Sequence, residues 1–263
     1  MKTARKAVSL LRAFTRQEPE LGVNELARRL DLDPATVHRL LRTLQAEGFI
    51  EQIEVTRKYR LGLGVLELAS GLLQQRGIVG VAMPFLEDLH AKTEETVILD
   101  AFNGAEVVCL AALNSRQEVR TTSFVGERAP AYCTSAGQTF LAYMSPAERK
   151  AHLPRELKPL TPKTVIDPAQ LTEILAEIAR TGIAVSDESC HRGVRGISAP
   201  IFGAGVPVIA TVSVTVPKQR LTLKQMASLS RLVKMTATAI SDALKRLDPH
   251  GTLRPASERP LDR

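Results

Sequence analysis

The chain has 263 residues, of which 44% are hydrophobic and 24% are charged, and its formal net charge at pH 7 is +7. No run approaches 18 consecutive apolar residues, so the composition predicts a soluble globular protein without a membrane span. The cysteines (Cys109, Cys133 and Cys190) are too widely spaced for a disulfide framework, which favours reduced thiols in a cytoplasmic protein.

The first 60 residues show short helices followed by a hairpin. Apolar residues recur at helical spacing in residues 3–15, 23–30 and 34–46, and the segments FIEQIE and RKYRLG are typical of short strands. This region carries 12 Lys/Arg against 8 Asp/Glu, so more than half of the net positive charge lies in less than a quarter of the chain. That concentration points to a polyanionic partner.

The second and third of these helices are joined by the short turn DLD, which predicts a helix-turn-helix. Asp33 is a good N-cap for the third helix, and Gly48 is placed to end it. Asp31 stands where such turns often have glycine, but aspartate tolerates left-handed backbone. An arbitrary helical hairpin with a charged exterior is the alternative. The small Ala27, where the helices must approach, and the hairpin that follows both favour DNA binding.

The third helix has two unlike faces. Its apolar stripe consists of Val37, Leu40, Leu41 and Leu44. Its other face is polar or titratable and carries Thr36, His38, Arg39, Arg42 and Thr43. We expect Thr36, His38 and Arg39, near the start of the helix, to contact base edges. Arg42, with Arg57 and Lys58 of the hairpin, is placed to contact phosphates.

The next part of the chain begins with a leucine-rich helix over residues 63–76, which must pack on something, and we expect a second copy of the chain. An amphipathic helix follows over residues 78–93. The segments TVILDAF and EVVCLAAL form strands around the turn Asn103-Gly104, and EVRTTSFV is predicted to be a further strand.

Helices and strands alternate to the end. Residues 135–143 are expected to be helical, Ser145 opens another short helix as part of a capping box, and residues 168–181 form a helix stopped by Gly182. The segments GIAVSDES, VRGISAPIF and PVIATVSVTV are strand-like, and a long helix closes the region. Antiparallel strands bracketed by helices favour an α+β sensory domain.

The stretch from Gly22 to Gly62, ending VHRLLRTLQAEGFIEQIEVTRKYRLG, resembles the winged helix of IclR-type bacterial transcription regulators. The resemblance extends over residues 4–245 and implies an α+β protein with a GAF-like antiparallel sheet that binds an effector. The expected domains are a winged helix-turn-helix (1–62), a linker and dimerisation helix (63–77), the effector domain (78–247) and a disordered tail (248–263).

The segment PAYCTSAGQTFLAY resembles the family's lead into a helix whose N-terminus faces the effector. Its small residues Ser135, Ala136 and Gly137 leave backbone N–H groups accessible, which makes a natural seat for a carboxylate. The resemblance also implies that Val194, Gly196, Ser213 and Thr215 line the pocket, although each could equally be an ordinary strand residue.

The chain departs from the family at this pocket. Gly196 stands where many relatives have cysteine, Ser186 where several have aspartate, and Gln138 in place of the usual lysine. We expect the missing side chain at position 196 to enlarge the pocket. The effector would then be an aromatic or branched acid rather than one of the smallest acids.

A cytosolic Cys-dependent enzyme with an accessory winged helix is the alternative function. It would start from Cys133, whose thiol pKa a helix start could lower, or from the adjacent pair Cys190-His191. Adjacency in sequence does not supply a base in space, and a lone cysteine is more often a small buried hydrophobe. The same three residues lack paired metal-ligand spacing, so a zinc site is a weak alternative. GAGVP at 203–207 lacks the lysine and hydroxyl of a phosphate loop.

The sequence therefore predicts a transcription regulator, either repressor or activator, without catalytic residues, metal or cofactor. It is expected to be a homodimer or homotetramer that binds a palindromic double-stranded DNA operator and responds to a small organic acid, with no membrane partner.

Overall fold

The computed structural model describes residues 2–203 and 206–246, so the predicted tail and part of GAGVP lie outside the described residues. The chain divides into two compact units, Met1–Arg76 and Gly77–Arg263, and each has its own hydrophobic core. Within the described ranges, no helix has both the length and the hydropathy needed to cross a membrane.

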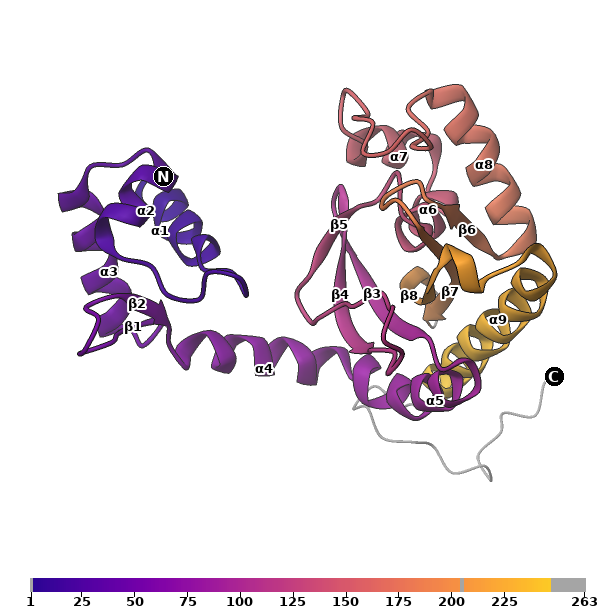
Figure 1. Ribbon diagram of the computed structural model, residues 1–263, viewed down its shortest axis with the longest axis horizontal. Helices are drawn as coiled ribbons and strands as arrows, with labels where there is room; N and C mark the ends of the chain where they lie inside the picture. The colour runs from indigo at the N-terminus through magenta and orange to yellow at the C-terminus, as the bar shows by residue number, and fades with distance from the viewer. Residues whose placement is uncertain (1, 204–205, 247–263) are drawn as a thin grey trace, which may run out of the picture. The chain divides into compact units, whose positions relative to one another are not determined.

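The N-terminal unit is a helix-turn-helix with a wing (Figure 1). Its elements are α1 (Lys2–Ala13), α2 (Val23–Leu30), α3 (Pro34–Ala46), β1 (Ile50–Gln52), β2 (Tyr59–Leu61) and α4 (Gly64–Arg76). The wing strands are antiparallel, with Ile50 opposite Leu61. Side chains from α1, α2, α3 and the wing form one core, which includes Leu10, Leu26, Leu41, Ile50 and Tyr59. The wing is therefore packed onto the helices through its buried face.

Local contacts fix the corner between α2 and α3. Asp31 adopts left-handed backbone with φ 51°, which confirms that aspartate can occupy this turn. The Asp33 carboxylate accepts a hydrogen bond from the Thr36 amide at 2.8 Å and so caps α3. Near the other end of α3, a Cβ on Gly62 would lie 2.3 Å from the Gly48 carbonyl oxygen. Only glycine at position 62 therefore allows the chain that leaves β2 to approach the backbone of Gly48 so closely.

The C-terminal unit is built on one antiparallel sheet with the order β5-β4-β3-β8-β7-β6. Its strands are β3 (Thr96–Asn103), β4 (Glu106–Leu113), β5 (Arg128–Pro130), β6 (Ala184–Asp187), β7 (Val194–Gly203) and β8 (Val206–Pro217). Its helices are α5 (Ile78–Thr93), α6 (Ser135–Ala142), α7 (Pro146–His152), α8 (Pro168–Thr181) and α9 (Leu223–Lys245), with the short 3-10 helix Lys218–Arg220. The α+β class predicted from the sequence is confirmed.

The two faces of this sheet pack differently. Helices α5 and α9 cover one face, where alternate strand residues such as Val97, Leu99, Val212 and Val214 are fully buried. The intervening residues point to the other face, where α6 packs against β7 and β8 and α8 packs on α6 (Figure 1). The polar side chains of β3 and β8 therefore face α6 rather than the apolar core.

The predicted strand EVRTTSFV is wrong, because residues 118–125 pair with no strand and form an irregular connection. Side chains hold this segment instead of a ladder: the Asn114 amide group both donates to the Ser123 carbonyl and accepts from the Ser123 amide. The Thr121 carbonyl accepts from the Thr96 hydroxyl at 2.6 Å. The segment is thereby kept beside β3 and β8.

Candidate functional site

The solvent-facing side of α3 is polar and cationic. His38, Arg39, Arg42 and Thr43 are exposed, whereas Val37, Leu40 and Leu41 of the same helix are buried in the core. Thr36 is half-buried, and its amide is taken by the Asp33 cap. Within the described part of the chain, Arg39 and Arg42 form no ion pair, so α3 presents two uncompensated guanidinium groups.

The two wing residues predicted to contact phosphates, Arg57 and Lys58, differ in exposure and in ion pairing. Arg57 is exposed at the hairpin turn, with φ 56°, and its backbone is fixed by hydrogen bonds to Ile53 and from Gln52. Lys58 is half-buried and lies 3.4 Å from the Glu25 carboxylate. Glu25 also accepts the Gly22 amide at 2.6 Å, and this contact, helped by Lys58, lowers the pKa of its carboxyl group. Arg57 is thus the less engaged of the two cations.

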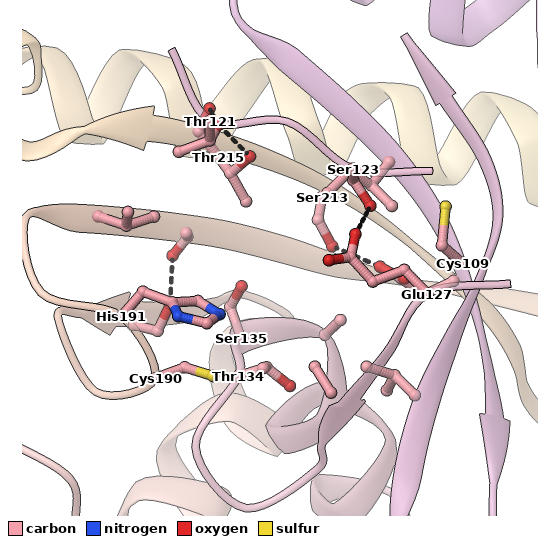
Figure 2. A pocket seen from close by; sticks show the side chains of 18 of the residues that line it. Cys109, Thr121, Ser123, Glu127, Thr134, Ser135, Cys190, His191, Ser213 and Thr215 are labelled. Atoms are coloured by element: carbon pink, nitrogen blue, oxygen red, sulfur yellow. Dashed lines mark hydrogen bonds between the residues drawn. The ribbon is translucent and has the colours of Figure 1, made fainter. Parts of the chain in front are cut away.

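The C-terminal unit contains a cavity of about 440 Å³ between the polar face of the sheet and the start of α6 (Figure 2). This volume lies within the range of small-molecule sites. The predicted effector residues that line it are Ser135, Ala136, Val194, Gly196, Ser213 and Thr215. The loop at residues 120–123 closes one side, and there Thr121 shares a 2.8 Å hydrogen bond with Thr215.

Gly137 is the predicted effector residue that does not line the cavity. Its amide donates to the Thr134 hydroxyl at 3.1 Å, because Thr134 is the N-cap of α6. A Cβ at this position would lie 2.2 Å from the Ala131 Cα, so the glycine serves a close backbone approach. The expectation that the Gly137 amide is accessible is wrong. The amides of Ser135 and Ala136, which no side chain caps in the described residues, remain at the helix start.

Gly196 does not enlarge the cavity as expected. A Cβ there would lie 2.7 Å from the Ser135 hydroxyl and 2.8 Å from the Ser186 hydroxyl. The space that a side chain would occupy is therefore filled by two hydroxyl groups, which come from separate elements, α6 and β6. The argument from Gly196 to a larger acid loses its support.

Two carboxyl groups that the sequence analysis did not single out also line the cavity. Asp100 on β3 is only 6% exposed and accepts a 3.4 Å hydrogen bond from the Ser213 hydroxyl. The pKa of Asp100 is raised to about 7, chiefly by burial; the hydrogen bond from Ser213 opposes this shift and the nearby charge of Glu127 adds to it. Asp100 is the charged residue inside the apolar run TVILDAF, and it shares a strand face with Ile98. A lone charge in such a run could have indicated a site residue.

Cys109 and Cys190 line this cavity, Cys133 is buried behind Cys190, and all three thiols are free. Cys133 is 1% exposed, as the simple buried-hydrophobe interpretation predicted, and its thiol donates to the Pro130 carbonyl at 3.6 Å. It lies beside Cys190, and the contact with Cys133 together with His191 lowers the pKa of Cys190 to about 5. The same contact and burial raise the pKa of Cys133. Among the described residues, no group of at least three His, Cys, Asp or Glu side chains could hold a metal ion.

Comparison with known proteins covers both units. Residues 3–54 match the model of the IclR helix-turn-helix domain, and residues 70–242 match that of the bacterial transcriptional regulator IclR C-terminal domain. The HTH-type transcriptional regulator BhcR of Paracoccus denitrificans is 33% identical over 223 residues, which cover 84% of this chain and 80% of that protein.

Solved structures agree with this assignment. An IclR transcriptional regulator from Silicibacter sp. TM1040 superposes with a TM-score of 0.81 at 31% identity, over 94% of this chain and 98% of that one. An IclR homolog from Microbacterium hydrocarbonoxydans, complexed with 4-hydroxybenzoate, gives 0.81 at 27% identity, over 91% and 98% of the two chains. These relatives are regulators, so the enzyme alternative has no support. The chain belongs to the IclR family of bacterial transcriptional regulators, as a DNA-binding regulator with a C-terminal effector-binding domain.

Proposed function

We propose that the regulator binds a palindromic operator by placing α3 in the major groove and the β1–β2 wing against the backbone. The observation that carries this proposal is the exposed cationic face of α3, whose Arg39 and Arg42 form no ion pair with any residue that the structure describes. Base edges are contacted by Thr36, His38 and Arg39, and phosphates by Arg42, Arg57 and Lys58, with Thr43 on the same face. Because Lys58 is held by Glu25, Arg57 makes the stronger contact of the two wing cations.

Titration of a duplex with variants tests this docking. Selection from random duplexes is expected to yield two symmetric half-sites, since two-fold operators are bound by paired subunits. On the selected duplex, Arg39→Ala is expected to cost about 1–3 kcal/mol and to relax base preference. Arg57→Ala is expected to weaken all duplexes similarly and to reduce the salt dependence.

Arg180→Ala is the matched control, because Arg180 is an exposed arginine of the C-terminal unit that pairs with Glu177 at 2.5 Å. Operator binding that matches the wild type in both Arg39→Ala and Arg57→Ala would show that α3 and the wing do not dock as proposed.

The effector is, in this proposal, a small organic acid that binds in the C-terminal cavity and modulates operator binding or transcription. The Ser135 and Ala136 amides at the start of α6 supply hydrogen-bond donors and a partial positive charge for a carboxylate. The Ser213 and Thr215 hydroxyls lie on the same face of β8 and both line the cavity. The aromatic acid bound by the Microbacterium relative supports this ligand class.

Thermal-shift screening tests the proposed carboxylate-binding site at the start of α6. Acids are expected to raise the melting temperature of the protein more than their amides do, because only the carboxylate gains from the helix start. Stabilisation by neutral hydrophobic compounds and by no carboxylate would overturn this assignment of the cavity.

The protein acts, in this proposal, as a homodimer or homotetramer. Leu63, at the start of the linker, and Leu66 and Leu68 of α4 are 76%, 63% and 67% exposed, which is unusual for three nearby leucines. A second copy of the chain would cover them and would also pair the two DNA-binding heads that a palindromic site requires.

A further inference from the structure

Two carboxyl groups face the same cavity from different parts of the sheet. Asp100 lies on β3, whereas Glu127 lies on the connection that leads into β5, and both line the cavity wall. The two are close enough for the charge of Glu127 to act on Asp100. Ser123 donates to Glu127 Oε2 at 2.7 Å, and Ser213 donates to Asp100 Oδ2 at 3.4 Å. Within the described part of the chain, each carboxyl group therefore receives hydrogen bonds at one oxygen, Oδ2 of Asp100 and Oε2 of Glu127.

The second oxygens of Asp100 and Glu127 form no hydrogen bond within the described residues, and because both side chains line the cavity, these oxygens are open to a ligand rather than sealed inside the protein. The arginines of the cavity wall bond elsewhere: Arg128 pairs with Glu106 at 2.5 Å, and Arg120 donates to the Gln117 carbonyl at 2.9 Å. A buried carboxyl group with an unused oxygen is costly unless a donor satisfies it. A ligand in the cavity could therefore supply the donor that the described protein groups do not give to the second oxygen of Asp100.

The donors for an acid lie on another side of the same cavity. His191 and Cys190 lie away from Glu127 and Ser123 in Figure 2, with Ser135 at the start of α6 on their side. The contact with Cys190 raises the pKa of His191, and the contacts with Cys133 and His191 lower that of Cys190, so His191 and Cys190 form an imidazolium–thiolate pair. The donors offered to an acid on this side are therefore the N–H groups of the His191 ring and of the start of α6. A ligand that spans the cavity would therefore meet donors at one end and acceptors at the other.

We propose that the effector is a bifunctional acid, whose carboxylate lies at the α6 and His191 side and whose hydroxyl or amino group donates hydrogen bonds to Asp100 and Glu127. This inference rests on the proposed function of the cavity as an acid site, and it adds the second functional group. The 4-hydroxybenzoate of the Microbacterium complex has this combination of an acid and a hydroxyl group.

Isothermal titration of the full-length protein at pH 8 tests the second group. At that pH Asp100 is ionised, because its pKa is about 7. The probes are two matched sets: benzoate, 4-hydroxybenzoate and 4-methoxybenzoate, and pentanoate, 5-hydroxypentanoate and 5-methoxypentanoate. On at least one scaffold, the hydroxy acid is expected to bind about 10-fold or more tightly than both the parent acid and the methyl ether, because only it donates to a carboxylate.

Variants identify the acceptor. Asp100→Leu, which keeps the branched skeleton of the side chain but cannot accept a hydrogen bond, and Glu127→Gln are each expected to reduce the preference for the hydroxy acid to within about threefold. Retained affinity for the parent acid shows that the cavity is still formed. Glu177→Gln, an exposed acid on α8, is the control and is expected to keep the full preference.

The outcomes separate the two proposals. Equal binding of parent, hydroxy and methoxy acids on both scaffolds would overturn the bifunctional ligand and leave the acid site standing. A hydroxy-acid preference that survives in Asp100→Leu and in Glu127→Gln would also overturn it. Failure of every acid to bind would overturn the acid site itself, and the inference would fall with it.

Discussion

Replacement of Asp100 by asparagine is expected to stabilise the ligand-free protein at high pH and to change little at low pH. Burial favours the protonated form of this carboxyl group and raises its pKa from 3.8 to about 7. Between those values the folded state holds a proton that the unfolded state has lost, so stability falls as pH rises from about 4 to about 7. Above pH 7 the loss of unfolding free energy is complete, because Asp100 is then ionised in the folded protein as well as in the unfolded chain.

The magnitude follows from the size of the shift. One pKa unit corresponds to about 1.4 kcal/mol, so the cost of Asp100 is about 4 kcal/mol at pH 8 and about 2 kcal/mol at pH 5. Asparagine has a similar shape and does not titrate. The difference in unfolding free energy between Asp100→Asn and the wild type is therefore expected to grow by about 2–3 kcal/mol from pH 5 to pH 8.

Differential scanning calorimetry measures this difference, with the transition of the C-terminal unit followed at both pH values. The exposed Asp242→Asn on α9, whose carboxylate pairs with Lys245 at 3.2 Å, is the control for a simple change of net charge. A difference between Asp100→Asn and the wild type that stays constant from pH 5 to pH 8, or that shrinks, would refute the assignment of a buried, protonated Asp100.

Other predictions concern the linker, the cavity and the thiols. Leu66→Glu is expected to shift the protein toward monomer and to weaken operator binding in parallel, as measured by light scattering and titration; a monomeric wild type at micromolar concentration would contradict this. Gly196→Leu is expected to abolish stabilisation by acids while leaving operator binding intact, because its side chain would displace the hydroxyl of Ser135 at the start of α6 and that of Ser186 on β6; unchanged acid binding would count against the site. At pH 7, iodoacetamide is expected to modify Cys190 well before Cys133, and mass spectrometry of the peptides checks this order, since Cys190 has the lower pKa and the greater exposure.

Local sequence was sufficient for the elements of the N-terminal unit. The cap at Asp33, the tolerance of Asp31 for a left-handed turn and the end of α3 just before Gly48 were all predicted, because each depends on a residue and its immediate neighbours. The apolar periodicity of α3 likewise separated its buried stripe from the exposed face that carries Arg39. The period-2 pattern of β8 also placed Ser213 and Thr215 on one face, which proved to be the face of the cavity.

Only the tertiary structure decided how distant segments meet. EVRTTSFV has the composition of a strand, but contacts with Asn114 and Thr96 hold it as a loop, and no local pattern encodes them. Asp100 and Glu127 are separated in sequence by β4 and the loop that follows it, so their shared cavity could not be foreseen. The missing side chain of Gly196 predicted a larger pocket, whereas hydroxyl groups from α6 and β6 fill that space in the structure. Burial, packing and pKa depend on these long-range contacts, whereas helix starts, turns and strand faces depend on neighbours in the chain.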